Sequence, residues 1–355
     1  MVPVRLPIFG LLFVLAAFAA LLVLAAFAAL PARAEVKITD PWPDPASLSI
    51  EGQAVSFPSL SPFDIGGIDD AKTHPTETRA TLFLPPGASA TAKVPAVIML
   101  HGAAGVLEAR ELTYGPQLAA MGIAALAVDT YGSRRDMAAS FIGRALHITE
   151  TMFVADAYSG LRFLAANPAI DAHRVVLAGF SYGGMATTYA LYRQLADALA
   201  PPDLRFIGHV AYYGPCIAHF DDNRTTGAPL LMLQGADDIL LDRNRCEAVA
   251  DELRAGGSNV AIVRYPGAVH QWDGGWGRRT IGRDLAPCRF TVSKSGTIHD
   301  DRLLGLPMLN PFLRGVSLGL CTGGPFPIGR DDAVRAQSNR DFGAFLDRAF
   351  AGPQG

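Results

Sequence analysis

Residues 175–184 read Val-Val-Leu-Ala-Gly-Phe-Ser-Tyr-Gly-Gly. An apolar run ends at a glycine, one serine follows, and two further glycines lead into a stretch that favours a helix. Residues 179–183 match the pattern G-x-S-x-G, in which the serine occupies a strained turn between a strand and a helix. The pattern predicts that Ser181 is a nucleophile at a helix N-terminus, where partial positive charge stabilises an oxyanion.

Two interpretations of this turn remain open. The five-residue pattern is weak by itself, and the alternative is a glycine-rich turn with an incidental serine. The context favours the nucleophile, because a strand precedes the serine, a helix follows it, and candidate partners come later in the chain in the required order.

The acid and the base are expected on loops that follow strands. A serine hydroxyl needs a base within hydrogen-bond reach, and the base needs a carboxylate that orients it. Residues 230–238 read LLMLQGADD, and we favour Asp238 as the acid with Asp237 as the fallback. Two solvated turn aspartates are the alternative, since Asp is common in turns. His270, at the end of YPGAVH, is the candidate base because it follows the acid in the chain.

A second glycine-containing loop, HGAAG at residues 101–105, follows the apolar run 96–100. Small residues let backbone N–H groups turn towards a reacting oxygen, and the second donor is the residue after the nucleophile. We therefore predict an oxyanion hole made by the amides of Ala103 and Tyr182, with His101 supporting the loop. A tight glycine turn without catalytic meaning is the alternative.

The order of elements predicts an α/β fold. Short runs rich in β-forming residues alternate with helical stretches, which indicates a mostly parallel, doubly wound sheet with helices on both faces. The predicted strands are residues 80–84, 96–100, 124–129, 175–179, 207–213, 230–234 and 261–265, with edge strands near 48–57. The predicted helices are residues 107–121, 148–167, 184–199, 243–255 and 331–350.

Residues 35–355 are expected to form a single domain, because no shift of composition marks a second one. The alternation stops after His270, and residues 271–325 form a long stretch rich in Gly, Arg and Pro. A loop of this length is unusual inside a compact domain, so an ordered irregular excursion held by a disulfide is predicted. Trp272 and Trp276 either line a substrate pocket or pack this excursion against the core.

The N-terminus has the pattern of an export signal. Arg5 precedes an apolar run, and Ala32-Arg33-Ala34 resembles a cleavage site, so residues 1–34 are predicted to be a secretory signal peptide. An uncleaved membrane anchor is the alternative, since the run is long enough to span a bilayer. The protein is therefore expected to be periplasmic or secreted. A formal net charge of −3 gives no reason to expect nucleic acid as a partner.

The chain has four cysteines, all beyond the predicted signal: Cys216, Cys246, Cys288 and Cys321. An even number in an oxidising compartment suggests two disulfides, and sequence proximity favours pairing the first two and the last two. Four cysteines allow three pairings, and free buried thiols are a further alternative. No C-x-x-C or H-x-x-x-H spacing suggests a zinc site.

Taken together, these motifs resemble the dienelactone hydrolase family of the α/β-hydrolase superfamily. The resemblance covers about residues 80–272 and rests on LHG at 100–102, VDTY at 128–131, the serine turn, GADD at 235–238 and YPGAVH at 265–270. It implies Ser181 as nucleophile, Asp238 as acid and His270 as base.

This chain departs from the family pattern in one respect. The namesake enzymes have a cysteine nucleophile, whereas this chain has Ser181, which points to a broader serine esterase. No clear counterpart of the family's carboxylate-binding glutamate and arginine is found, although Glu108, Arg134 and Arg135 lie in plausible loops.

The expected function is an exported, cofactor-free and metal-free serine hydrolase that cleaves small carboxylic esters through an acyl-enzyme. The same triad could act on a peptide, an amide or a thioester, and a non-catalytic binding module is a further alternative. A membrane is expected as a partner only if the signal stays uncleaved, and the oligomeric state is left open.

Overall fold

The computed structural model describes residues 32–33, 35–68 and 74–351. Residues 1–31 and 34 of the predicted signal lie outside the described residues. Within the described ranges, no helix combines the length and the apolar character needed to cross a membrane.

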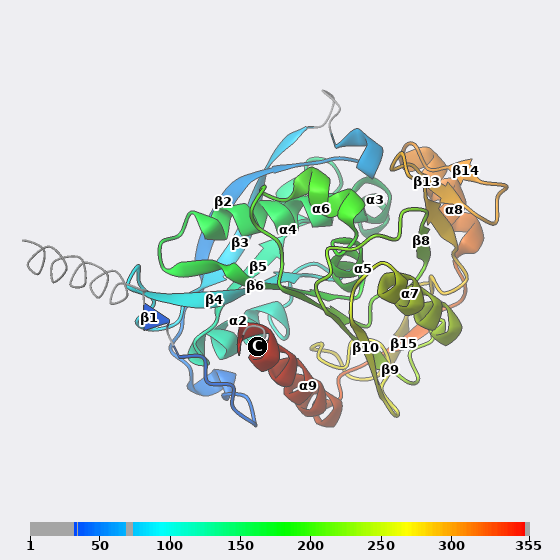
Figure 1. Cartoon of the computed structure of the whole chain (residues 1–355). Coiled ribbons are helices and arrows are strands. Elements are labelled where there is room, and N and C mark those ends of the chain that lie inside the picture. The colour runs from blue at the N-terminus through cyan, green and yellow to red at the C-terminus, as the bar shows by residue number, and fades with distance from the viewer. Residues whose placement is uncertain (1–31, 34, 69–73, 352–355) are drawn as a thin grey trace, which may run out of the picture.

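A twisted sheet forms the centre of the molecule (Figure 1). Its strand order is β10-β9-β7-β6-β4-β5-β3-β2, and β1 pairs with β4. The pairs from β10 to β5 are parallel, whereas β3 pairs antiparallel with both β5 and β2 at the edge. The strands are β1 (Ala32–Arg33), β2 (Gln53–Leu60), β3 (Pro75–Phe83), β4 (Ala92–Leu100), β5 (Ala124–Asp129), β6 (Ile170–Phe180), β7 (Gly208–Tyr212), β9 (Leu230–Gly235) and β10 (Val260–Tyr265).

Helices cover both faces of the sheet, as the alternation predicts. The α4 and α5 helices pack on one face, with α6 against α4, and α2 and α9 lie on the other face (Figure 1). The helices are α2 (Glu111–Ala120), α3 (Phe141–His147), α4 (Glu150–Ala165), α5 (Tyr182–Tyr189), α6 (Arg193–Leu199), α7 (Arg243–Ala255), α8 (Pro311–Cys321) and α9 (Asp332–Ala351). Short 3-10 turns are η1 (Pro45–Ser47), η2 (Ile65–Gly67) and η3 (Gly132–Arg134). The predicted α/β-hydrolase architecture is confirmed.

The central strands explain why the sheet is buried on both sides. Residues 96–100 of β4 and 175–178 of β6 are apolar at every position and have no exposed surface. A strand that is apolar on both faces is stable only where helices cover both faces. The loops that follow the carboxyl ends of these strands are therefore anchored to the buried centre of the sheet.

One predicted helix is wrong in its continuity. The stretch 184–199 is interrupted between α5 and α6, where Tyr192 pairs with Thr225 in an isolated bridge and stacks on Phe220 with ring centroids 3.8 Å apart. The Arg193 N–H donates to the carbonyl of Arg224. These tertiary contacts replace the helical hydrogen bonds at this point, which local sequence preference does not anticipate.

The excursion at 271–325 is more regular than predicted. It contains β11 (Arg279–Ile281), β12 (Phe290–Val292), β13 (Ile298–Asp300), β14 (Leu306–Pro307) and α8, and it is followed by β15 (Phe326–Ile328). The β12 strand pairs with β8 (Ala218–Phe220), and β11 pairs with β15. Strands of two or three residues are too short to show a periodic pattern, so the sequence did not reveal them.

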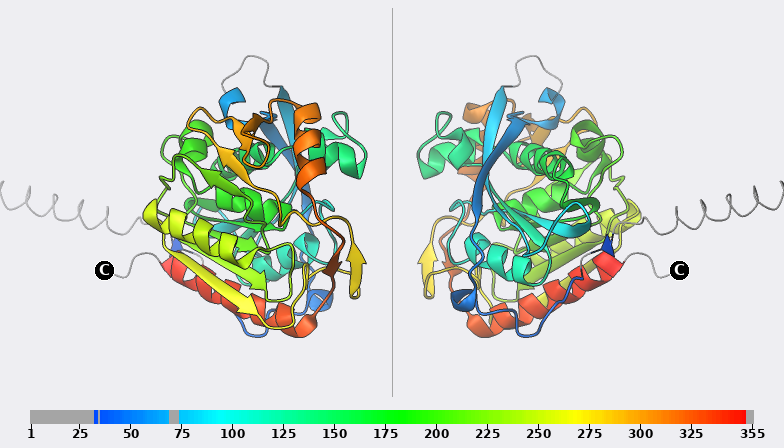
Figure 2. Two further views of the ribbon diagram at one scale, coloured as in Figure 1. Left: turned by 90° about the vertical axis from the view of Figure 1, so that its right-hand side faces the viewer. Right: turned by 90° about the vertical axis from the view of Figure 1, so that its left-hand side faces the viewer.

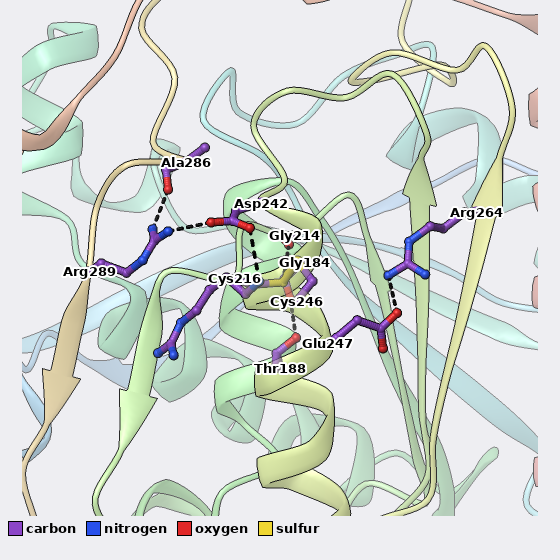
Figure 3. Close-up of a disulfide and its surroundings, with 11 residues drawn as sticks. Gly184, Thr188, Gly214, Cys216, Asp242, Cys246, Glu247, Arg264, Ala286 and Arg289 are labelled. Atoms are coloured by element: carbon purple, nitrogen blue, oxygen red, sulfur yellow. Dashed lines mark hydrogen bonds and ion pairs between the residues drawn. A yellow bond between two sulfur atoms is a disulfide. The ribbon is translucent and has the colours of Figure 1, made fainter.

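Both predicted disulfide pairings are confirmed. Cys216 pairs with Cys246, and Cys288 pairs with Cys321. The first bond joins the loop after β7 to α7, close to Gly184 of α5 (Figure 3). The second lies wholly within the excursion and ends at the last residue of α8.

Candidate active site

Ser181 lies on the turn between β6 and α5. Its backbone has φ 53°, which is the left-handed region that side-chain-bearing residues rarely adopt, and its N–H donates to the Tyr212 carbonyl at 2.9 Å. A Cβ atom at Gly183 would collide with the backbone of Leu100 and His101, so only glycine fits beside this turn. Close packing of neighbouring backbone therefore maintains the strained turn.

The structure brings three of the predicted residues into one hydrogen-bonded line. His270 Nε2 lies 2.8 Å from Ser181 Oγ, and His270 Nδ1 lies 2.7 Å from Asp238 Oδ2. A neutral imidazole that donates from Nδ1 to the carboxylate accepts at Nε2, which is the arrangement that removes a proton from a serine. All three side chains are nearly buried, with Ser181 8% exposed and His270 1% exposed.

The two adjacent aspartates lie in different environments. Asp238 is buried and also accepts from the Leu240 N–H at 3.0 Å, whereas Asp237 is exposed. The Asp237 N–H donates to the Ala268 carbonyl, which joins the acid loop to the loop that carries His270. Only Asp238 therefore reaches the imidazole.

The loop after β4 lies against the serine. A Cβ atom at Gly102 would lie 3.2 Å from Ser181 Cβ, so the glycine allows this approach. In the described part of the chain, the Ala103 N–H donates to no acceptor, and the first N–H groups of α5, beginning with Tyr182, lack partners within the helix. Both predicted oxyanion donors thus belong to segments that border Ser181.

His101 supports this loop from behind. Its Nδ1 lies 2.7 Å from the Gly102 carbonyl, and its Nε2 accepts from the Tyr131 N–H at 3.3 Å. Burial lowers the pKa of His101 to about 4, despite an opposing effect of the bond to Gly102. The ring is therefore neutral at ordinary pH and serves as a hydrogen-bonded brace.

Sequence reasoning missed a buried polar cluster behind His270. The Tyr213 ring packs edge-on against His270 with centroids 4.7 Å apart, and its hydroxyl donates to Asp273. Arg110, which has no exposed surface, lies 2.7 Å from Glu111 and 3.5 Å from the Tyr213 hydroxyl. No local pattern in the sequence indicates that these residues meet.

The other candidates form no hydrogen bond with Ser181, Asp238 or His270 among the described residues. Arg134 forms a buried ion pair with Asp156 at 2.7 Å, while Glu108 and Arg135 are exposed. Trp272 is fully buried and donates to Ser338 Oγ of α9 at 3.1 Å, so it packs the excursion against the core. Trp276 is partly buried, with the Arg279 guanidinium 4.9 Å from its ring.

A cavity of about 940 Å³ lies between the β2–β3 edge and the loop after β5. Its lining includes Glu77, Arg79 and Asp136 but none of Ser181, Asp238 and His270. This cavity is therefore separate from the three hydrogen-bonded residues. Among the described residues, no group of three or more His, Cys, Asp or Glu side chains is arranged to hold a metal ion.

Comparison with curated proteins gives short matches. The chain is 31% identical over 105 residues to a Salmonella typhimurium protein provisionally described as a carboxymethylenebutenolidase. The match covers 29% of this chain and 38% of that protein, and a Salmonella typhi protein with the same description is 30% identical over 105 residues.

Comparison with solved structures gives longer but more distant matches. A Klebsiella pneumoniae protein provisionally described as a dienelactone hydrolase has 23% identity and a TM-score of 0.47, covering 62% of this chain and 88% of its own. A Thermogutta terrifontis esterase has 13% identity and a TM-score of 0.44, covering 65% and 87%.

The comparison with family models matches residues 79–273, more than half of the chain, to the family described as dienelactone hydrolase. These residues include the turn at Ser181, the aspartate loop and His270. The chain therefore belongs to the dienelactone hydrolase family.

Proposed function

We propose that this protein is a serine hydrolase that cleaves carboxylic esters. The observation that carries the proposal is the hydrogen-bonded line from Asp238 through His270 to Ser181. Membership of the dienelactone hydrolase family supports the choice of an ester.

The reaction proceeds through a covalent acyl-enzyme. Ser181 Oγ attacks the acyl carbon while His270 Nε2 takes the hydroxyl proton, and Asp238 stabilises the imidazolium. The amides of Ala103 and Tyr182 donate to the oxyanion. The C–O bond to the alcohol breaks as His270 returns the proton to the leaving oxygen. Water then attacks the acyl group with His270 as base, and Ser181 is released.

We also propose that residues 35–355 are exported and form one domain. Two disulfides support an oxidising compartment, since such bonds are rare in the cytosol. The reaction as proposed uses only side chains and backbone of this chain and requires no cofactor.

Labelling with a fluorophosphonate tests the proposal directly. The purified protein, without residues 1–34, is treated with the probe, and the modified peptide is mapped by mass spectrometry. We expect a single adduct on Ser181 that His270→Ala abolishes. Ser159→Ala is the matched control, because Ser159 has the same exposed fraction, 8%, and should label like the wild type.

A folded wild-type protein that does not label at Ser181 would contradict the proposal. A panel of p-nitrophenyl esters, thioesters and aminoacyl anilides then separates the bond types. Turnover of anilides in preference to esters would show that the triad serves an amidase instead.

A further inference from the structure

A buried ion pair connects the excursion to the residue after the nucleophile. Arg314 of α8 lies outside the residues that match the family, and its Nη2 is 2.8 Å from Glu150 Oε2. Its Nη1 lies 3.3 Å from Glu150 Oε1, and its Nε donates to the Ala145 carbonyl at 2.9 Å. Arg314 is 4% exposed and Glu150 is 5% exposed.

Both members of the pair are charged. Burial alone would raise the pKa of Glu150, but the Arg314 guanidinium and the hydrogen bonds that the carboxylate accepts together hold the pKa below its usual range. A paired charge in a dry site is strongly coupled to its partner, since removal of one leaves the other buried and uncompensated. The geometry of this pair is therefore well defined.

The pair holds the phenol of Tyr182. The Tyr182 hydroxyl donates to Glu150 Oε2 at 2.6 Å and accepts from Arg314 Nη2 at 3.1 Å. The ring packs edge-on against Phe153 with centroids 5.0 Å apart. Tyr182 is the first residue of α5, directly after Ser181. Its side chain is thus fixed at the tip and along the ring, in the residue whose backbone N–H is the predicted oxyanion donor.

We infer that Arg314 is a positioning residue for the oxyanion hole, acting through Glu150 and the Tyr182 phenol on the direction of the Tyr182 N–H. The inference rests on the proposed function. The α8 helix lies beside α3 (Figure 2), and its last residue, Cys321, is bonded to Cys288. The excursion therefore has a catalytic consequence, because it delivers a cation to the segment that carries an oxyanion donor.

The test compares Arg314→Met with Arg314→Lys in ester hydrolysis and in fluorophosphonate labelling. An oxyanion donor acts on the transition state, so we expect Arg314→Met to lower kcat about tenfold, with KM within about twofold. The labelling rate at Ser181 should fall by a similar factor. Arg314→Lys retains a cation and should recover part of kcat.

Arg134→Met is the matched control. The Arg134–Asp156 pair is also buried and its atoms lie at a similar distance, 2.7 Å, but none of its contacts reaches Tyr182. We expect this variant to unfold at a lower temperature while its kcat, measured where it stays folded, remains within about twofold of the wild type.

A folded Arg314→Met variant with wild-type kcat and labelling rate would overturn this inference but would leave the proposed function intact. If that variant does not fold, Tyr182→Phe tests the same connection, because it removes only the hydroxyl and retains the ion pair. Tyr182→Phe should lower kcat without raising KM, and wild-type kcat would overturn the inference. A wild-type protein that neither labels nor hydrolyses esters would instead overturn the proposed function and this inference with it.

Discussion

Two regions of this molecule contribute to the same site in different ways. The family-matched region, residues 79–273, supplies Ser181, Asp238 and His270 from loops at the carboxyl ends of β6, β9 and β10. The excursion beyond it supplies no member of that hydrogen-bonded line, yet Arg314 reaches the phenol of the residue next to the serine. In our proposal, the reacting groups come from the family-matched region, while the accuracy of their arrangement depends on a segment that lies outside it.

The largest expected effect is at the nucleophile. Ser181→Ala should lower kcat by about 10⁶-fold, as expected when a triad serine is removed. The free energy of unfolding should change by less than about 1 kcal/mol, because the substitution removes one oxygen and leaves the packing intact. Steady-state ester hydrolysis and chemical denaturation measure the two quantities. Substantial ester hydrolysis by the folded variant would show that Ser181 is not the nucleophile.

The next effect distinguishes two neighbouring carboxylates. Asp238→Asn should lower kcat by about 10⁴-fold, because the amide cannot hold the imidazole in the required tautomer. Asp237→Asn is the control and should keep kcat within about twofold, since Asp237 is exposed and does not reach His270. Equal losses in both variants would show that the loop as a whole, rather than the Asp238 carboxylate, supports catalysis.

A smaller effect is expected from the excursion disulfide. Replacing Cys288 and Cys321 by serine should lower stability by roughly 2–4 kcal/mol. It should also lower kcat about fivefold, because α8 positions Arg314 less accurately. The control is the same replacement in Arg314→Met, where no further loss of kcat is expected if the disulfide acts through the arginine. If the losses of kcat from the disulfide replacement and from Arg314→Met are fully additive, the disulfide does not act through Arg314.

The smallest effect on activity is expected from a change inside the family-matched region that alters only the pH dependence of stability. Burial lowers the pKa of His209 to about 4, and its Nδ1 contacts the Thr187 carbonyl at 3.0 Å. The unfolded chain binds a proton below about pH 6.5, while the folded protein does not until about pH 4, so stability is lost as the pH falls between these values. The contribution is at most about 1.4 kcal/mol per pH unit.

His209→Gln should therefore flatten the pH dependence of the unfolding free energy between about pH 6.5 and 4. His173→Gln is the control, because His173 is exposed. Denaturant titrations at several pH values provide the measurement. An unchanged slope in His209→Gln would mean that other groups cause the acid sensitivity.

The fold and the triad candidates were predictable from local patterns. Apolar runs such as residues 175–178 are long enough to identify buried strands, and the loops that follow them carry Ser181, Asp238 and His270 in the required order. The pairing of the cysteines also followed from sequence proximity.

The contacts of the excursion were not predictable. Glu150 and Arg314 are 164 residues apart, and nothing near either residue indicates that they meet. Such a pair is decided by how α8 folds back over α3 and α4, which depends on tertiary packing rather than on local preference. The contact between Tyr213 and His270 was not predictable for the same reason, because the two residues are distant in the chain and belong to no common motif.

The central claim is that Ser181 becomes acylated during turnover. The most direct measurement is rapid mixing with p-nitrophenyl acetate, followed by acid quench and mass spectrometry of the peptide that contains Ser181. The account predicts a burst of p-nitrophenol together with an acetyl group on Ser181, and neither in Ser181→Ala. Ester turnover with no acetyl group on Ser181, undiminished in Ser181→Ala, would contradict it.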